Sequence, residues 1–188
     1  MELVNGRECG ECTVCCTALT IDTEEFKKVP GVQCAHLCGG GCSIYETRYP
    51  VCRQYHCGWR YLEFLGEHWR PDKSGVLINF EADNKTLGYD KGGVNFFIVA
   101  PPPKPFIREW AGRIAHLISS NVAVYLSVAG PPGCYSITKF LSEELREAAM
   151  KRDMAHIEIA LTDAVAMHRF QPQLFTRASD MEEDTRVG

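Results

Sequence analysis

The chain has 188 residues with a formal net charge of −4, and 45% of its residues are hydrophobic and 23% charged. This is an ordinary composition for a single globular domain with a sizeable core. The acidic balance offers no general attraction to nucleic acid or to an anionic membrane, so we expect neither as a partner. No run of about 18 apolar residues occurs, so we expect no transmembrane span.

Cysteine is the unusual component, with ten residues of which nine lie between Cys9 and Cys57. The first residues, MELVNGRECGEC, lack the basic and apolar regions of a secretory signal, so we expect a cytoplasmic protein with reduced thiols. Dense cysteine in a reducing compartment favours metal binding over disulfides, and a disulfide framework remains the alternative.

The cysteines begin as a tight series and then spread along the next forty residues. Cys9, Cys12, Cys15 and Cys16 form the series CGECTVCC, and five more follow at Cys34, Cys38, Cys42, Cys52 and Cys57. Two cysteines separated by two residues can present both sulfurs to one ion from a single turn. Because thiolates are soft ligands, the spacing predicts zinc, an iron–sulfur cluster or copper(I), and excludes magnesium and calcium.

Cys15 and Cys16 are adjacent, and adjacent side chains diverge in either a strand or a helix. We therefore expect them to serve two different centres, or one to bind and the other to pack as a small hydrophobe. Zinc and iron–sulfur both stay open, because the ferredoxin-like start of the series breaks at Cys16.

The segment 9–60 resembles the CxxCxxCC cysteine-cluster family, which is described as zinc- or iron-chelating. The family pattern continues with Cys-x-x-Leu, Cys-x-Ile-Tyr, Arg-Pro and Cys-Arg, and this chain departs from it by reading Arg48-Tyr49-Pro50. The resemblance implies eight metal ligands: Cys9, Cys12, Cys15, Cys16, Cys34, Cys42, Cys52 and Cys57. Cys38 is additional to the pattern, and it and His36 are further candidates.

The metal could be a single ion, a pair of ions or an iron–sulfur cluster. The resemblance also implies an enzyme as an alternative function, because the flagellin lysine methylase is a relative with the same cluster. A third alternative is a zinc-stabilised interaction module presenting Arg48, Arg53 and Arg60 to an unknown protein or small-molecule partner. No hydrolase, kinase, nucleotide-loop or deaminase motif occurs, so the sequence nominates no catalytic residue.

The rest of the chain alternates strand and helix signals. In chain order we expect a hairpin of residues 76–81 and 85–90, a strand at 95–100, a helix after the prolines 101–105, a strand at 122–128, a helix at 138–152 capped by Thr138, and a helix at 154–168. Together they predict an α+β fold, in which a cysteine-rich metal-binding lobe packs on a small body of mixed sheet and helices. We expect one domain over residues 1–170, with the lobe at about 1–60 and the body at about 74–170. Residues 171–188 are expected to form a mobile tail.

Overall fold

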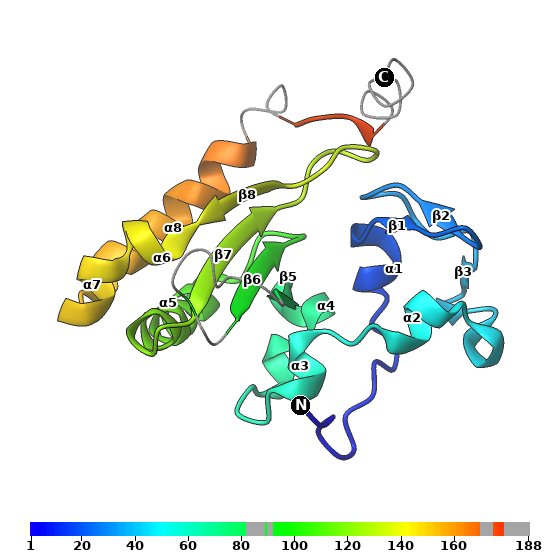
Figure 1. Ribbon diagram of the computed structural model, residues 1–188, viewed down its shortest axis with the longest axis horizontal. Coiled ribbons are helices and arrows are strands. Elements are labelled where there is room, and N and C mark those ends of the chain that lie inside the picture. Colours follow the sequence, from blue (N-terminus) through cyan, green and yellow to red (C-terminus); the bar gives the residue numbers. More distant parts are fainter. Residues whose placement is uncertain (82–88, 90–91, 170–174, 179–188) are drawn as a thin grey trace.

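The computed structural model describes residues 1–81, 89, 92–169 and 175–178, and the fold is α+β, with a four-stranded mixed sheet and packed helices (Figure 1). The strands follow one another across the sheet in chain order: β5 (Val76–Glu81), β6 (Gly93–Ile98), β7 (Ala123–Val128) and β8 (Ile137–Phe140). β6 and β7 are parallel, and the two outer pairings are antiparallel. The parallel pair requires a crossover, which the helix α5 (Lys104–Ser119) provides.

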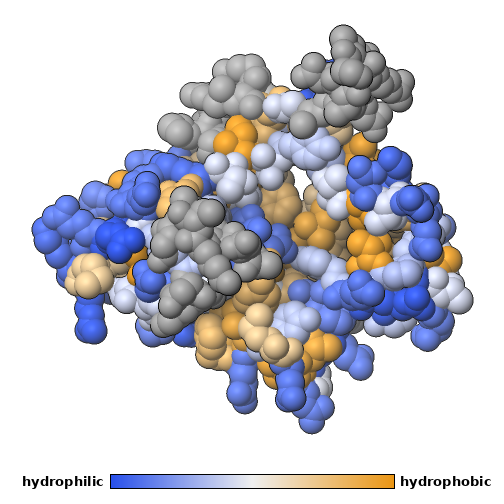
Figure 2. Space-filling model, viewed as in Figure 1, coloured by the Kyte–Doolittle hydropathy of each residue, from blue (hydrophilic) through white to orange (hydrophobic). Residues whose placement is uncertain are grey.

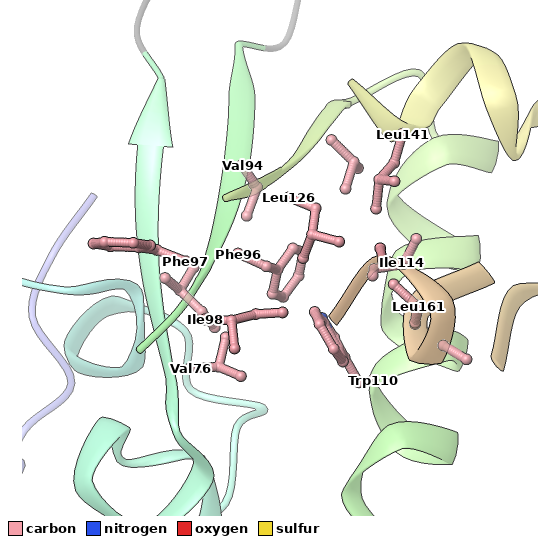
Figure 3. Packing of buried hydrophobic residues seen from close by; sticks show 14 of the residues in the cluster. Val76, Val94, Phe96, Phe97, Ile98, Trp110, Ile114, Leu126, Leu141 and Leu161 are labelled. Carbon is pink, nitrogen blue, oxygen red and sulfur yellow. The ribbon is translucent and has the colours of Figure 1, made fainter. Parts of the chain in front are cut away.

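Helices cover one face of this sheet (Figure 1). Besides α5 they are α6 (Leu141–Glu144), α7 (Arg146–Lys151) and α8 (Met154–Arg169). Phe96 and Leu126 point from the strands toward Trp110 and Ile114 of α5, and the rings of Phe96 and Trp110 lie 5.8 Å apart (Figure 3). Because side chains alternate along a strand, the neighbouring Phe97 points to the opposite face of the sheet.

The cysteine-rich lobe precedes the sheet and consists of very short elements. They are α1 (Val14–Ala18), β1 (Ile21–Asp22), β2 (Lys27–Lys28), β3 (Leu37–Cys38), β4 (Gly41–Cys42), the 3₁₀ turn η1 (Tyr45–Thr47), α2 (Pro50–Gln54) and α3 (Gly58–Tyr61). The 3₁₀ turn η2 (Glu67–Trp69) and α4 (Pro71–Ser74) lead into β5. Of the first 58 residues, Ala18 and Cys57 are the only buried hydrophobic ones. The lobe therefore has almost no apolar core of its own.

The lobe joins the body along the edge strand β5. The packing is close at Gly58, where a Cβ atom would come within 2.5 Å of the Ile78 side chain. The rings of Tyr61 and Phe80 meet edge to face at 5.8 Å. Trp59 and Trp69 are buried in the shared core, as expected of aromatic residues that attach the lobe to the body.

Most elements expected from the sequence are confirmed, and one is wrong. The strands at 76–81, 95–100 and 122–128 and the two longest helices are present within a few residues of their expected bounds. The expected helix at 138–152 is replaced by β8, α6 and α7. Thr138 does not cap a helix, because its hydroxyl lies 2.7 Å from that of Ser127 on the paired strand β7. Pairing with β7 holds residues 138–140 extended, and the helical part of the expected segment begins only at Leu141.

Two further expectations concern segments that the structure describes only in part. Residues 85–90, the expected second strand of the hairpin, lie outside the described residues except for Tyr89, and β5 pairs with β6. Of the expected tail, residues 175–178 are described, and Ala178 and Thr176 form main-chain hydrogen bonds with Gly133 and Tyr135. Within the described ranges, no helix has the length and apolar character needed to cross a membrane.

Candidate functional site

The eight cysteines nominated from the sequence fall into two sets of four electrostatic neighbours. The first set, here called group one, contains Cys9, Cys12, Cys15 and Cys57. The charge of Cys9 raises the pKa of Cys12, and the charges of Cys9 and Cys12 raise the pKa values of Cys15 and Cys57. Group one thus joins the start of the chain to the residue before α3.

The second set, here called group two, contains Cys16, Cys34, Cys42 and Cys52. Cys52 interacts with the other three members. The N–H of Cys34 also donates to the carbonyl oxygen of Cys16 at 3.0 Å, which fixes the loop beside α1. Group two therefore joins α1, the hairpin of β3 and β4, and α2.

Cys15 and Cys16 lie side by side in α1 and belong to different groups. Cys15 donates its S–H to the sulfur of Cys16, and this bond raises the pKa of Cys15, as do burial and the charge of Cys16. The same bond lowers the pKa of Cys16, and the nearby charges of Lys28 and Arg48 lower it further, against the effect of burial. The adjacent pair therefore links the two groups, and the contact between the two sulfurs shows that the side chains do not diverge as the sequence suggested.

Main-chain N–H groups point at the sulfurs of group one. The N–H groups of Val14 and Asp72 donate to Cys12, and those of Trp59 and Arg60 donate to Cys57. Such donors favour the thiolate form of a cysteine. Burial acts in the opposite direction and is the larger effect, since it raises the pKa of Cys12 and raises that of Cys57 to about 11.

Cationic side chains lie beside both groups. Nη1 of Arg60 lies 3.7 Å from the sulfur of Cys9 in group one. Lys28 is buried, with 7% of its surface exposed, and its ammonium interacts with Cys34, Cys16 and Cys52 of group two and also with Cys15 of group one. The charge of Arg48 lowers the pKa values of Cys16 and Cys52, and its guanidinium lies over the Tyr45 ring, 3.8 Å from the ring centroid. These charges would offset part of the negative charge of four thiolates around a divalent ion.

The main chain turns tightly where sulfurs are presented. Gly10 has a φ of +54°, which allows the turn in which the N–H of Cys12 donates to the carbonyl of Cys9 at 2.9 Å. Arg7 holds this arm against α3 through hydrogen bonds to the carbonyls of Trp59, Leu62, Glu63 and Leu65. The turn at Gly10 and the contacts of Arg7 with α3 therefore position the first cysteines of group one.

The two further candidates differ in their surroundings. Cys38 is exposed at the end of β3, beside the glycine turn that leads to β4. The His36 ring packs 5.7 Å from Phe26 and 5.8 Å from Tyr49, so it belongs to an aromatic cluster. Cys134, in the loop before β8, is buried in the body.

The sulfurs of each group are neighbours, but they do not surround a common metal position. All ten cysteines lie in the described ranges and all are free thiols. Over those ranges, no three His, Cys, Asp or Glu side chains are arranged so that they could hold an ion as they stand. A bound ion would require the thiols of a group to turn toward a common centre.

Several residues that shape the site carry no motif and were missed in the sequence. Asp72 accepts two hydrogen bonds from Arg70, at 2.7 and 2.8 Å, and also hydrogen-bonds Cys12. The Tyr55 hydroxyl donates to Oδ1 of Asn79 at 2.6 Å, and its pKa is raised by burial and then by Cys57 and Cys15. Nothing in the sequence distinguishes these residues, or the buried Lys28 from the exposed Lys27 beside it.

Comparisons with family models, curated proteins and solved structures produced no match for this chain.

Proposed function

We propose that this protein binds zinc or iron through two cysteine centres, one in each group. The observation that supports the proposal is the division of the eight cysteines into two sets of four that meet at Cys15 and Cys16. Four sulfur ligands are the usual complement of a structural zinc ion or of an iron–sulfur cluster. The N–H donors and the cations beside the groups would stabilise the thiolates.

The metals would act chiefly by holding the lobe together. Two buried hydrophobic residues in the first 58 cannot repay the conformational entropy of ordering so many short elements. A metal centre joins distant loops and contributes its binding free energy to folding. Removing the metal should therefore unfold the lobe before the sheet and its helices.

Metal analysis of single cysteine variants tests the division into two centres. Wild-type protein purified without oxygen or chelators should hold two equivalents of metal, or two clusters. Cys57→Ser should empty group one and Cys52→Ser group two, so each should retain one equivalent. Cys38→Ser is the matched control, because it removes an exposed cysteine of the same segment that lies outside both groups.

Two results would contradict the proposal. A metal-free wild-type protein would exclude metal binding, and the loss of all metal in both Cys57→Ser and Cys52→Ser would indicate one shared centre. The absorption spectrum of the same samples separates the metals, because iron–sulfur clusters are brown and zinc thiolate is colourless.

A metal-dependent enzyme is the second candidate. It is favoured by one observation: Tyr55 interacts with the cysteines of group one and also lines a cavity of ≈ 550 Å³. An open cavity beside a metal centre is where a substrate would bind. A brown protein with labile sulfide would favour the enzyme over a purely structural role. A colourless protein whose metal coordination positions are all filled by sulfur would count against the enzyme.

A further inference from the structure

The sheet face turned away from the helices carries uncharged polar side chains in its centre. Asn79 of β5 lies directly opposite Asn95 of β6, and Ser127 of β7 is on the same face. The Asn79 oxygen accepts the Tyr55 hydroxyl, and Ser127 pairs with Thr138. Oδ1 of Asn95 is buried, however, and has no hydrogen-bond partner in the described part of the chain. A buried amide oxygen without a donor is unfavourable, and because the protein covers this oxygen, a donor from outside the chain would reach it only when the amide turns toward the cavity.

A cavity of ≈ 160 Å³ lies over this face, between the sheet and the cysteine-rich lobe. The surface is hollowed between the lobe and the body (Figure 2). The cavity is walled by the polar face, by the residues after α1 and by the loop between β7 and β8. Phe97 contributes an aromatic surface, because it points away from the helices (Figure 3). None of the described residues that line the cavity is charged, so it favours an uncharged, flat occupant.

The cavity of ≈ 550 Å³ adjoins the smaller one, and Leu19, Thr20 and Asn79 line both. Its volume lies within the range of small-molecule sites. Aromatic side chains line it, and Glu81 is the single carboxylate among its described lining residues, which include no lysine or arginine. Met1 and His56 also line the cavity, and the pKa of His56 is lowered by burial and by the charges of Arg60 and Arg48, which favours its neutral ring. Among the side chains, a phosphate group would therefore face the negative charge of Glu81.

We propose that the two adjoining cavities bind a purine nucleoside, with the base in the smaller cavity against Asn95 and the sugar in the larger one. A carboxamide pairs with the amine and the ring nitrogen of adenine through two hydrogen bonds. The last torsion of asparagine is broad, so Asn95 can turn its oxygen and nitrogen toward such an edge. An aromatic ring such as Phe97 stacks on any base. None of the described residues that line the two cavities is one of the eight candidate metal ligands, so the proposal assigns no role to the metal beyond keeping the lobe wall folded.

Calorimetric titration of the full chain with adenosine, adenosine monophosphate and cytidine tests the class of ligand. Adenosine should bind with one site per chain. The monophosphate should bind at least about tenfold more weakly, because its charge meets Glu81. Cytidine should bind more weakly than adenosine, because its single ring covers less of Phe97, although its amine and ring nitrogen can form the same two hydrogen bonds. Absence of adenosine binding at millimolar concentration, equal binding of cytidine, or tighter binding of the monophosphate would overturn the proposal.

The variant Asn95→Leu tests the residue. It removes the unpartnered amide and keeps a similar volume, so adenosine affinity should fall at least about tenfold. The melting temperature should not fall, because the buried oxygen without a donor is removed as well. Asn5→Ala is the matched control, since it changes an exposed asparagine near the start of the chain and should bind like the wild type. Adenosine binding by Asn95→Leu at wild-type affinity would overturn the assignment. Metal content measured on the same samples should be unchanged, which separates this test from that of the metal centres.

Discussion

Lys28 is a buried cation in a lobe with almost no apolar core, and its replacement by methionine tests how that lobe is held. Nζ donates to the carbonyl oxygens of Thr17, Val29 and Val32 at 2.9, 3.2 and 3.0 Å. Methionine keeps most of the aliphatic stem and leaves three carbonyls without this donor. A hydrogen bond from a charged donor contributes about 1.5–3 kcal/mol, and less where water can replace the donor, as at the exposed residues Val29 and Val32. Burial disfavours the ammonium, so its removal recovers part of this lost free energy. We therefore expect the Lys28→Met variant to lose about 2–4 kcal/mol of unfolding free energy.

The assay is urea denaturation followed by the fluorescence of the buried tryptophans, with Lys27→Met as the matched control. Lys27 is in the same strand, but its side chain is 70% exposed and pairs with Asp22 at 2.8 Å on the surface. An exposed ion pair contributes little, so the control should stay within about 0.5 kcal/mol of the wild type. Equal stabilities of the two variants would refute the view that the three carbonyl contacts anchor the lobe. Lys28→Met should also retain metal in group two less well, because its charge lies beside those thiols.

Three further substitutions probe other contacts. Arg7→Lys should lower stability by about 1–3 kcal/mol, because lysine lacks the fork that serves four carbonyls around α3; chemical denaturation would measure it, and an unchanged midpoint would contradict it. Asp72→Asn removes a carboxylate that accepts from the Cys12 thiol and whose charge raises the pKa of Cys12, so metal affinity at group one should rise by up to about tenfold in a chelator competition while group two is unchanged. Glu109 has a lowered pKa, because the effect of burial is outweighed by the N–H of Trp69 at 2.8 Å and by His68. The contribution of Glu109 to folding stability is therefore present above the ordinary carboxyl pKa, and it is lost as the pH falls through the lowered pKa. Glu109→Gln should be less stable than the wild type by under about 1 kcal/mol near pH 7 and equal to it at acid pH, in melting curves recorded across that range.

The agreement between sequence and fold was greatest where the chain buries one regular face. The periodic apolar residues of α5 and α8 and the β-rich run of β7 were recognisable because each of these elements packs against one common core. The segment 138–152 failed as a helix prediction for the converse reason. Its first residues have polar neighbours that suit a helix start, but their pairing with β7 depends on residues more than ten positions away.

At the candidate site, the sequence by itself determined which thiols are available, and it predicted that Cys15 and Cys16 would serve different centres. Both follow from residue type and from the local geometry of the chain, which act over a few residues. Only the tertiary structure decided that Cys57 joins Cys9 and Cys12, that Cys52 joins Cys34 and Cys42, that Cys38 is exposed and that His36 packs against Phe26. It alone also distinguished the buried Lys28 from Lys27 and brought Asn79, Asn95 and Ser127 to one face over a cavity. These arrangements depend on how loops close and strands pair over tens of residues, and no local pattern in the sequence records the neighbours that result.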